Sequence, residues 1–166
     1  MTEPGFRPND MLGPLVDHGV RFVLIGGLGA RLRGSPSITN DVDICYERSD
    51  DNLERLAAAL RDLGALRGAP DDVPFLLDAK TLRAGDHFTF ITRAGSLDVL
   101  GTPAGTTGFE ALDRKADTVH IRGMAIRVSS IDDLIRMKLA AGRPDDLVEV
   151  EILGALREEL ERPDET

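Results

Sequence analysis

The chain has 166 residues, of which 42% are hydrophobic and 30% charged, and this length and composition predict one soluble globular domain. A net charge of -9 and an aromatic content of 4% argue against a protein that coats nucleic acid, which needs a basic surface and exposed rings. The single cysteine excludes an internal disulfide, and the sequence shows neither a signal peptide nor an apolar run that could span a membrane, so we expect a cytoplasmic protein.

The N-terminal part of the chain predicts an arm, a helix and a strand. Residues 1–8 contain two prolines and a glycine, which is typical of a loose arm. Residues 9–18 have helical character, and we expect Gly13 and Pro14 to interrupt this helix because proline removes a backbone donor. Residues 20–25 are apolar apart from Arg21 and precede a glycine pair, which predicts a buried strand.

The next segments predict a short helix, a strand and the clearest helix of the chain. Residues 28–32 are compatible with a short helix, and residues 42–46 have the composition of a strand. Cys45, within that strand, is expected to be a buried small side chain rather than a nucleophile. Ser49 is a typical N-cap residue, and apolar residues then recur at helical spacing as far as Gly64, a typical C-terminal stop.

The second half of the chain predicts two hairpins followed by two helices. Residues 65–74 have loop chemistry, and the segment from there to Ala84 leaves helix and loop open. Strand patterns then occur in two pairs, 88–92 with 96–100 and 118–122 with 125–129. A capping box at Ser129 or Ser130 starts one helix, and Pro144 starts the last. Strands and helices therefore interleave, which predicts an α+β fold: a small mixed β-sheet flanked by helices, with helices at the C-terminus.

Two aspartates one residue apart stand at the second predicted strand. Because successive side chains of a strand alternate between its faces, Asp41 and Asp43 share one face while Val42 and Ile44 point into the core. Two carboxylates on one face repel each other unless a cation lies between them, and Mg²⁺ prefers such oxygen ligands together with substrate phosphates. The pair predicts a Mg²⁺ site, and the alternative interpretation is a solvated strand end.

A glycine pair, Gly26-Gly27, follows the first predicted strand. Glycines allow a ligand to approach the backbone closely, and a helix N-terminus that follows them attracts anions. The alternative is a tight strand-to-helix turn. The dinucleotide-binding fingerprint is not matched, because no third glycine follows Gly27 and Gly29 at the required spacing. Together with the aspartate pair, the glycines predict a site for a nucleoside triphosphate and its Mg²⁺.

The order of strand, glycine pair and Asp-x-Asp strand resembles the signature of the DNA polymerase β-like nucleotidyltransferase superfamily. Residues 26–44, GGLGARLRGSPSITNDVDI, and residues 130–153, SIDDLIRMKLAAGRPDDLVEVEIL, are similar to the small AbiEii-like nucleotidyltransferases of abortive-infection and toxin-antitoxin systems. The resemblance covers roughly residues 20–157, and we expect a nucleotidyltransferase domain over residues 9–160, between the loose arm of residues 1–8 and a polar tail of residues 161–166.

This superfamily carries a third carboxylate on a neighbouring strand. Asp98 is the candidate, because apolar Leu97 and Val99 flank it in the alternation that a strand requires. Asp86 opens a strand and competes less well. The resemblance implies that three acids hold two Mg²⁺ ions, with the third acid also acting as general base: Asp41, Asp43 and Asp98.

The resemblance also implies residues that bind the nucleotide. Gly26 and Gly27 would cradle the β- and γ-phosphates, and three basic residues would offset the charge of the triphosphate: Arg33, Lys138 and Arg143. Relatives often carry a basic residue shortly before the Asp-x-Asp unit, where this chain has Ser37. Arg31 or Arg33 would have to replace that charge. The acids at 145 and 146 are expected to cap the last helix.

The implied reaction is the Mg²⁺-dependent transfer of a nucleoside monophosphate from an NTP to an acceptor hydroxyl. The acceptor is open between a tRNA 3′ end, a protein side chain and a small molecule such as an aminoglycoside. We favour tRNA or protein, in a toxin-like enzyme with a cognate antitoxin, although the acidic balance disfavours a large RNA footprint. The alternative is a catalytically silent protein of the same fold that binds a nucleotide or a partner.

Overall fold

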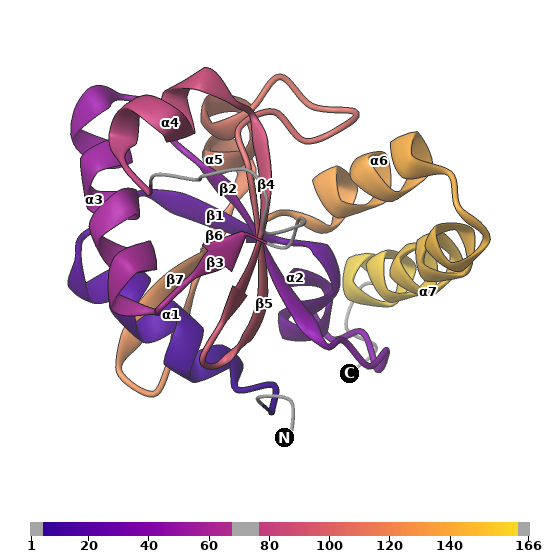
Figure 1. Cartoon of the computed structure of the whole chain (residues 1–166). Coiled ribbons are helices and arrows are strands. Elements are labelled where there is room, and N and C mark those ends of the chain that lie inside the picture. The colour runs from indigo at the N-terminus through magenta and orange to yellow at the C-terminus, as the bar shows by residue number, and fades with distance from the viewer. Residues whose placement is uncertain (1–4, 68–76, 163–166) are drawn as a thin grey trace.

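A computed structural model describes residues 5–67 and 77–162 of the chain. One seven-stranded mixed sheet forms its centre, in the order β3-β4-β5-β2-β1-β7-β6 (Figure 1). The strands are β1 (Phe22–Ile25), β2 (Asp41–Tyr46), β3 (Leu66–Arg67), β4 (His87–Thr92), β5 (Gly95–Leu100), β6 (Asp117–Ile121) and β7 (Met124–Val128). β1 runs parallel to β7 and β2 runs parallel to β5, whereas the other pairs are antiparallel.

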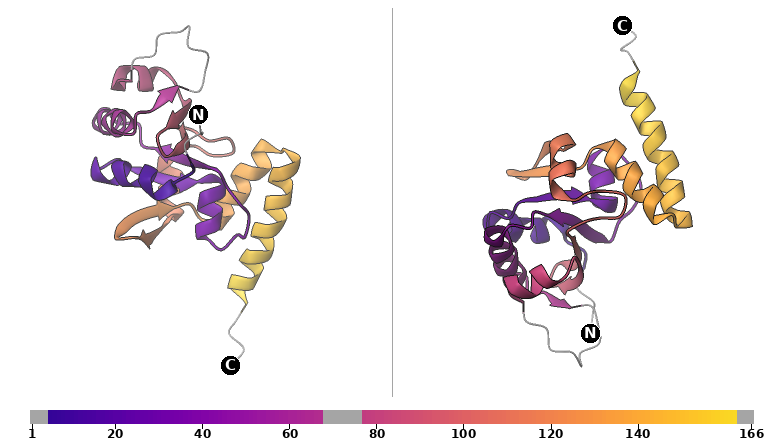
Figure 2. Two further views of the ribbon diagram at one scale, coloured as in Figure 1. Left: turned by 60° about the horizontal axis from the view of Figure 1, so that its bottom comes forward. Right: turned by 90° about the horizontal axis from the view of Figure 1, so that it is seen from above.

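Helices lie on both sides of this sheet. They are α1 (Pro8–Asp17), α2 (Gly26–Leu32), α3 (Asp50–Asp62), α4 (Ala79–Ala84), α5 (Phe109–Lys115), α6 (Ile131–Ala141) and α7 (Pro144–Glu161). α1, α3 and α4 lie on one side, and α2, α6 and α7 on the other (Figure 1). Figure 2 shows α6 and α7 side by side as a hairpin away from the sheet. Within the described residues, no helix combines the length and apolar character needed to cross a membrane.

The two faces of the sheet are covered to different extents. The face toward α1 and α3 is mainly apolar, with Val42 and Ile44 of β2 buried in the main core. On the opposite face, α5 packs over β1 and β2 around Val23 and Cys45. Burial raises the pKa of the Cys45 thiol to about 12, as expected for a small core side chain rather than a nucleophile. The part of this face that β4 and β5 contribute is open, and it borders the candidate site described below.

Most predicted elements occur in the structure, with ends displaced by one or two residues. The clearest cases are the helix starts: Ser49 accepts a hydrogen bond from the Asn52 amide, and Ser130 accepts one from the Asp133 amide. The predicted hairpins are β4–β5 and β6–β7. The expected α+β class is confirmed.

Four details differ from the expectations. α1 begins at Pro8 and continues through Gly13 and Pro14 without a break, because its apolar stripe of Met11, Leu12 and Leu15 is buried and outweighs one lost backbone hydrogen bond. α2 already begins at the first glycine of the pair. The ambiguous segment before Ala84 contains α4, capped by Asp78, and β3 lies within the expected loop, of which residues 68–74 are outside the described residues. α5 was not predicted, since Gly108 provides no side-chain cap.

Candidate active site

The three aspartates of the expected metal site lie on two adjacent parallel strands. Asp41 and Asp43 belong to β2 and Asp98 to β5, and the register pairs Asp43 directly with Asp98. Paired residues of neighbouring strands project from the same face, so all three carboxylates converge. One oxygen from each lies within 4.8 Å of the other two. Three hard oxygen donors at this separation are the donor set that Mg²⁺ prefers.

Electrostatic repulsion within this cluster is strong. Burial, the neighbouring charges of Asp41 and Asp98 and a hydrogen bond with Asp98 raise the pKa of Asp43 to about 8, and only the Lys138 charge acts in the opposite direction. At neutral pH the cluster therefore favours either a proton or a cation among its carboxylates. This property supports the fit of the three side chains to a divalent ion.

The glycine pair allows the backbone of α2 to approach the acids. Gly26 has a φ of +67°, and a Cβ atom at this position would overlap the carboxylate of Asp43. A Cβ atom at Gly27 would lie 2.8 Å from Oγ1 of Thr39, whose hydroxyl donates to the backbone carbonyl of Asp41 over 3.1 Å. Gly26 thus lies against the aspartates, and Gly27 makes room for the connection that leads into β2.

A cavity of about 260 Å³ opens beside the acids. Its lining includes the backbone of Gly26 and six polar residues: Asp43, His87, Asp98, Lys138, Arg143 and Asp146. Its apolar lining comes from β1, β5, α6 and the loop after β5: Ile25, Leu100, Pro103, Ala104, Leu134, Met137 and Ala141. The cavity therefore has a carboxylate wall, a cationic wall and an apolar wall.

One buried carboxylate fixes both cations of this cavity. Asp146, whose side chain is 4% exposed, accepts a hydrogen bond from Nε of Arg143 over 2.7 Å and lies 3.4 Å from Nζ of Lys138. It also caps α7 by accepting from the Arg143 backbone amide over 3.2 Å. The hydrogen bond from Arg143 lowers the pKa of this carboxyl, so it stays charged at neutral pH. Asp146 thus does more than the expected helix capping.

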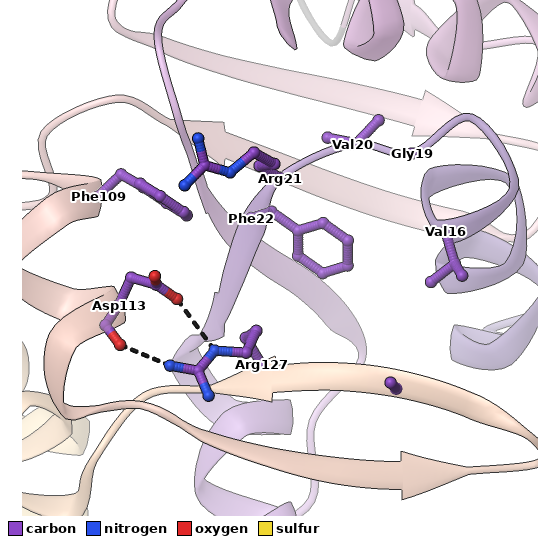
Figure 3. Close-up of a pocket in the computed structure, with 9 residues that line it drawn as sticks. Val16, Gly19, Val20, Arg21, Phe22, Phe109, Asp113 and Arg127 are labelled. Atoms are coloured by element: carbon purple, nitrogen blue, oxygen red, sulfur yellow. Dashed lines mark hydrogen bonds and ion pairs between the residues drawn. The ribbon is translucent and has the colours of Figure 1, made fainter.

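Another cavity, of about 350 Å³, lies at the opposite end of β1 (Figure 3). Its charged groups are engaged with neighbouring residues: Arg127 donates to the side chain and the backbone carbonyl of Asp113, and Arg21 forms an ion pair with Glu47. Arg21 also lies over the ring of Phe109, 5.2 Å from its centroid. Among the described residues, the group of three acids that could share a metal ion lies beside the other cavity, and the chemistry is therefore assigned there.

The structure brings together six of the eight residues that the sequence suggested for the site. Asp41, Asp43 and Asp98 form the acidic cluster, and the cavity beside it contains the other three: Gly26, Lys138 and Arg143. Gly27 lies beside Thr39 and outside the cavity lining.

Arg33 is directed elsewhere. Its guanidinium donates to the backbone carbonyls of Ser129 and Val128 and pairs with Asp117 at the far strands of the sheet. Arg31 donates to the backbone carbonyl of Ser37. Neither arginine lines the cavity.

Sequence reasoning did not single out two residues of this site. His87 begins β4, and its Nε2 lies 3.9 Å from Oδ1 of Asp98. The hairpin of β4 and β5 was predicted, but His87 lies one residue before the predicted strand of residues 88–92. Asp146 was interpreted as a helix cap, and its spacing of three residues from Arg143 was the signal that it also binds the guanidinium.

Comparison with known proteins identifies the architecture. Neither a family model nor a curated protein matched the sequence. Among solved structures, the lincomycin-bound lincosamide antibiotic adenylyltransferase LnuA matches with a TM-score of 0.60 and 14% identity over 90% of this chain and 95% of that chain. ANT(2")-Ia in complex with adenylyl-2"-tobramycin matches with a TM-score of 0.56 and 14% identity over 92% of this chain and 96% of that chain. The chain has the nucleotidyltransferase fold.

A Thermotoga maritima protein described as a nucleotidyltransferase shares this fold, with a TM-score of 0.54 and 18% identity over 93% of this chain and 94% of that chain. At identities this low, the similarity establishes the fold alone. It confirms the nucleotidyltransferase architecture expected from the glycine and aspartate motifs. The similarity to the AbiEii-like group, and the roles of individual residues, stay predictions.

Proposed function

We propose that this chain is a Mg²⁺-dependent nucleotidyltransferase that moves a nucleoside monophosphate from an NTP to a hydroxyl group of an acceptor. The observation that carries the proposal is the convergence of Asp41, Asp43 and Asp98 within 4.8 Å, beside a cavity that also contains Lys138 and Arg143. Acids that share a metal next to cations that face a polyphosphate are what this chemistry needs.

The acids have distinct roles in this proposal. Asp41, Asp43 and Asp98 would hold Mg²⁺, which when bound neutralises phosphate charge and favours ionisation of the attacking hydroxyl. The acceptor oxygen forms a bond to the α-phosphorus of the NTP. The bond from this phosphorus to the oxygen that bridges the α- and β-phosphates breaks, and pyrophosphate leaves. Asp98 would take the proton of the acceptor hydroxyl. The Thr89 hydroxyl, which donates to Oδ1 of Asp98 over 2.6 Å, orients this carboxylate.

The opposite wall of the cavity would bind the triphosphate. Lys138 and Arg143 supply positive charge there, and Asp146 keeps both side chains in place. Because no side chain projects from Gly26, the phosphates could approach the backbone of α2 next to Asp43. Arg33, which is engaged at the end of β7, has no part in the proposal.

For the acceptor, we propose the 3′ end of a tRNA or a hydroxyl of a protein, in a cytoplasmic, toxin-like enzyme that a cognate antitoxin would control. The support is the similarity of residues 26–44 and 130–153 to the AbiEii-like group. A small hydroxylated molecule is the second candidate. Two proteins of the same fold favour it, since one is a lincosamide adenylyltransferase with lincomycin bound and the other is complexed with adenylyl-2"-tobramycin.

A transfer assay tests the proposal. The pure protein is incubated with each labelled NTP and Mg²⁺, together with total tRNA, cell-lysate protein, lincomycin or tobramycin. We expect a labelled product from the wild type and none from Asp43→Ala, whereas Asp17→Ala, which removes an exposed carboxyl of α1, should behave as the wild type. If the wild type labels none of these acceptors, the chain is the catalytically silent protein instead.

A further inference from the structure

We infer that the outer face of β4, formed by His87, Thr89 and Ile91 and here called the β4 strip, binds the acceptor and selects acceptors without phosphate groups. This inference rests on the proposed function, and among the acceptors named there it favours the small hydroxylated molecule over the tRNA end. It concerns residues that belong to none of the sequence motifs.

The β4 strip is an uncovered part of the sheet next to the acids. Phe90 on the inner face of β4 is fully buried, whereas the His87 side chain is 57% exposed and Ile91 is 49% exposed. Thr89 is exposed as well, and it pairs with Asp98 across the β4–β5 ladder. Because Thr89 and Ile91 pair with Asp98 and Ser96 of β5, a molecule bound at the acids would lie against this strand.

The direction of the reaction places the acceptor on this side. In phosphoryl and nucleotidyl transfer the attacking and leaving oxygens lie roughly in line across the phosphorus atom. Pyrophosphate would leave toward Lys138 and Arg143, which come from the helices that follow β7. The acceptor must then approach from the opposite side. The sheet order places β4 beyond β5, on the side of Asp98 that faces away from β2, β1 and β7.

The apolar part of the cavity is available for the nucleoside. Leu134 and Met137 of α6 and Pro103 of the loop after β5 line it. Apolar side chains of this kind suit a base or ribose, and they leave the β4 strip as the polar surface next to Asp98. His87 Nε2, 3.9 Å from Oδ1 of Asp98, stands at the boundary between the two regions.

The charges of this surface disfavour one class of acceptor. β2, β4 and β5 contain no lysine or arginine, and their outward residues include three carboxylates: Asp41, Asp43 and Asp98. Nucleic acids gain most of their affinity from phosphate contacts with basic side chains. The β4 strip instead offers an imidazole and a hydroxyl as hydrogen-bond partners and an isoleucine as an apolar contact. It therefore fits a neutral or amine-bearing hydroxyl compound better than an RNA end.

The test measures KM separately for the two substrates in His87→Ala and Ile91→Ala. Lincomycin, tobramycin and total tRNA are the acceptor probes. We expect each variant to raise the KM of the accepted lincomycin or tobramycin about fivefold to tenfold, the loss of one contact, with the KM of the NTP within about twofold of the wild type. His87→Gln, which keeps a donor, should restore most of the acceptor affinity.

Matched controls come from the far side of the molecule. His120→Ala changes an exposed histidine of β6, at the other edge of the sheet, and Leu160→Ala changes an exposed leucine near the end of α7. Both should leave the two KM values unchanged. A general loss of folding would change the KM of the NTP and the KM of the acceptor together. A change in the acceptor KM alone therefore reports on the β4 strip.

The outcomes distinguish this inference from the proposed function. If the wild type transfers label to no acceptor, the proposed function fails and the inference fails with it. If transfer occurs but His87→Ala and Ile91→Ala keep the acceptor KM of the wild type, only the inference is overturned. It is likewise overturned if tRNA is the preferred acceptor and kcat/KM falls steeply with salt, as phosphate contacts require.

Discussion

Asp43→Asn should stabilise the metal-free protein, and more so as the pH rises. In the folded chain, burial and the charges of Asp41 and Asp98 raise the pKa of Asp43 to about 8, compared with 3.8 for a free carboxyl. A group with a raised folded pKa binds more protons in the folded than in the unfolded state. The free energy of unfolding therefore falls as the pH increases from about 4 to about 8.

The size of this effect follows from the displacement of the pKa. About four pKa units at about 1.4 kcal/mol each set an upper limit of about 6 kcal/mol above pH 8. The cavity beside Asp43 is open, and water in it screens the carboxylates, so we expect a gain of about 2–3 kcal/mol at pH 8 and almost none at pH 4. Asparagine keeps the shape of the side chain without its charge.

Urea unfolding in the presence of EDTA at several pH values between 4 and 8 measures this difference. The control is Asp17→Asn, which removes an exposed carboxyl at the end of α1 and should not reproduce the stabilisation seen with Asp43→Asn. Added Mg²⁺ should stabilise the wild type and leave Asp43→Asn nearly unchanged. Equal pH dependence of the wild type and Asp43→Asn in EDTA would refute the electrostatic reasoning.

Three further predictions concern the supports of the site. Gly26→Ala should abolish transfer and destabilise the fold, because the Cβ atom of the new alanine would overlap Asp43. Its control is Gly154→Ala on α7, where the space is open, and thermal unfolding should show this variant to be more stable than the wild type by about 0.5–1 kcal/mol. Asp146→Ala should raise the KM of the NTP at least about tenfold, since two cations lose their anchor, and an unchanged KM would contradict this role. Ser130→Ala removes the N-cap of α6 and should lower the free energy of unfolding in urea by about 1 kcal/mol. A variant as stable as the wild type would contradict this role of the cap.

The acidic cluster could be predicted because each of its parts is a local pattern. Asp41 and Asp43 share a face through the two-residue period of a strand, and the alternation around Asp98 follows the same rule. The direct pairing of Asp43 with Asp98 could not be predicted from the sequence pattern, because the register of two strands depends on the packing of the whole sheet. The resemblance to nucleotidyltransferases supplied the expectation that the two strands meet.

Features that depend on contacts between distant segments could not be predicted. Arg33 is near the glycine pair in sequence, but its guanidinium finds the free carbonyls at the end of β7. His87 lies outside the predicted strand of residues 88–92, and its approach to Asp98 follows from the register of the β4–β5 hairpin, which the pattern did not define. Pro14 was expected to interrupt a helix, and the buried apolar stripe of α1 overrides that local preference.

Ser37 is a further case, since it stands where relatives often carry a charge. It donates to Glu149 of α7 over 2.6 Å, and Ser35 donates to the same carboxylate over 2.7 Å. These bonds tie the connection that leads into β2 to the C-terminal helix. The segment thus has a structural role here that a reading of the sequence alone did not reveal.

Binding of Mn²⁺ in the presence of a non-hydrolysable NTP analogue, followed by electron paramagnetic resonance, tests the acidic cluster most directly. We predict about two Mn²⁺ ions per wild-type chain, fewer for Asp98→Asn and almost none for a variant with both Asp41→Asn and Asp43→Asn. Equal Mn²⁺ binding by the wild type and these variants would contradict the claim that Asp41, Asp43 and Asp98 form the metal site.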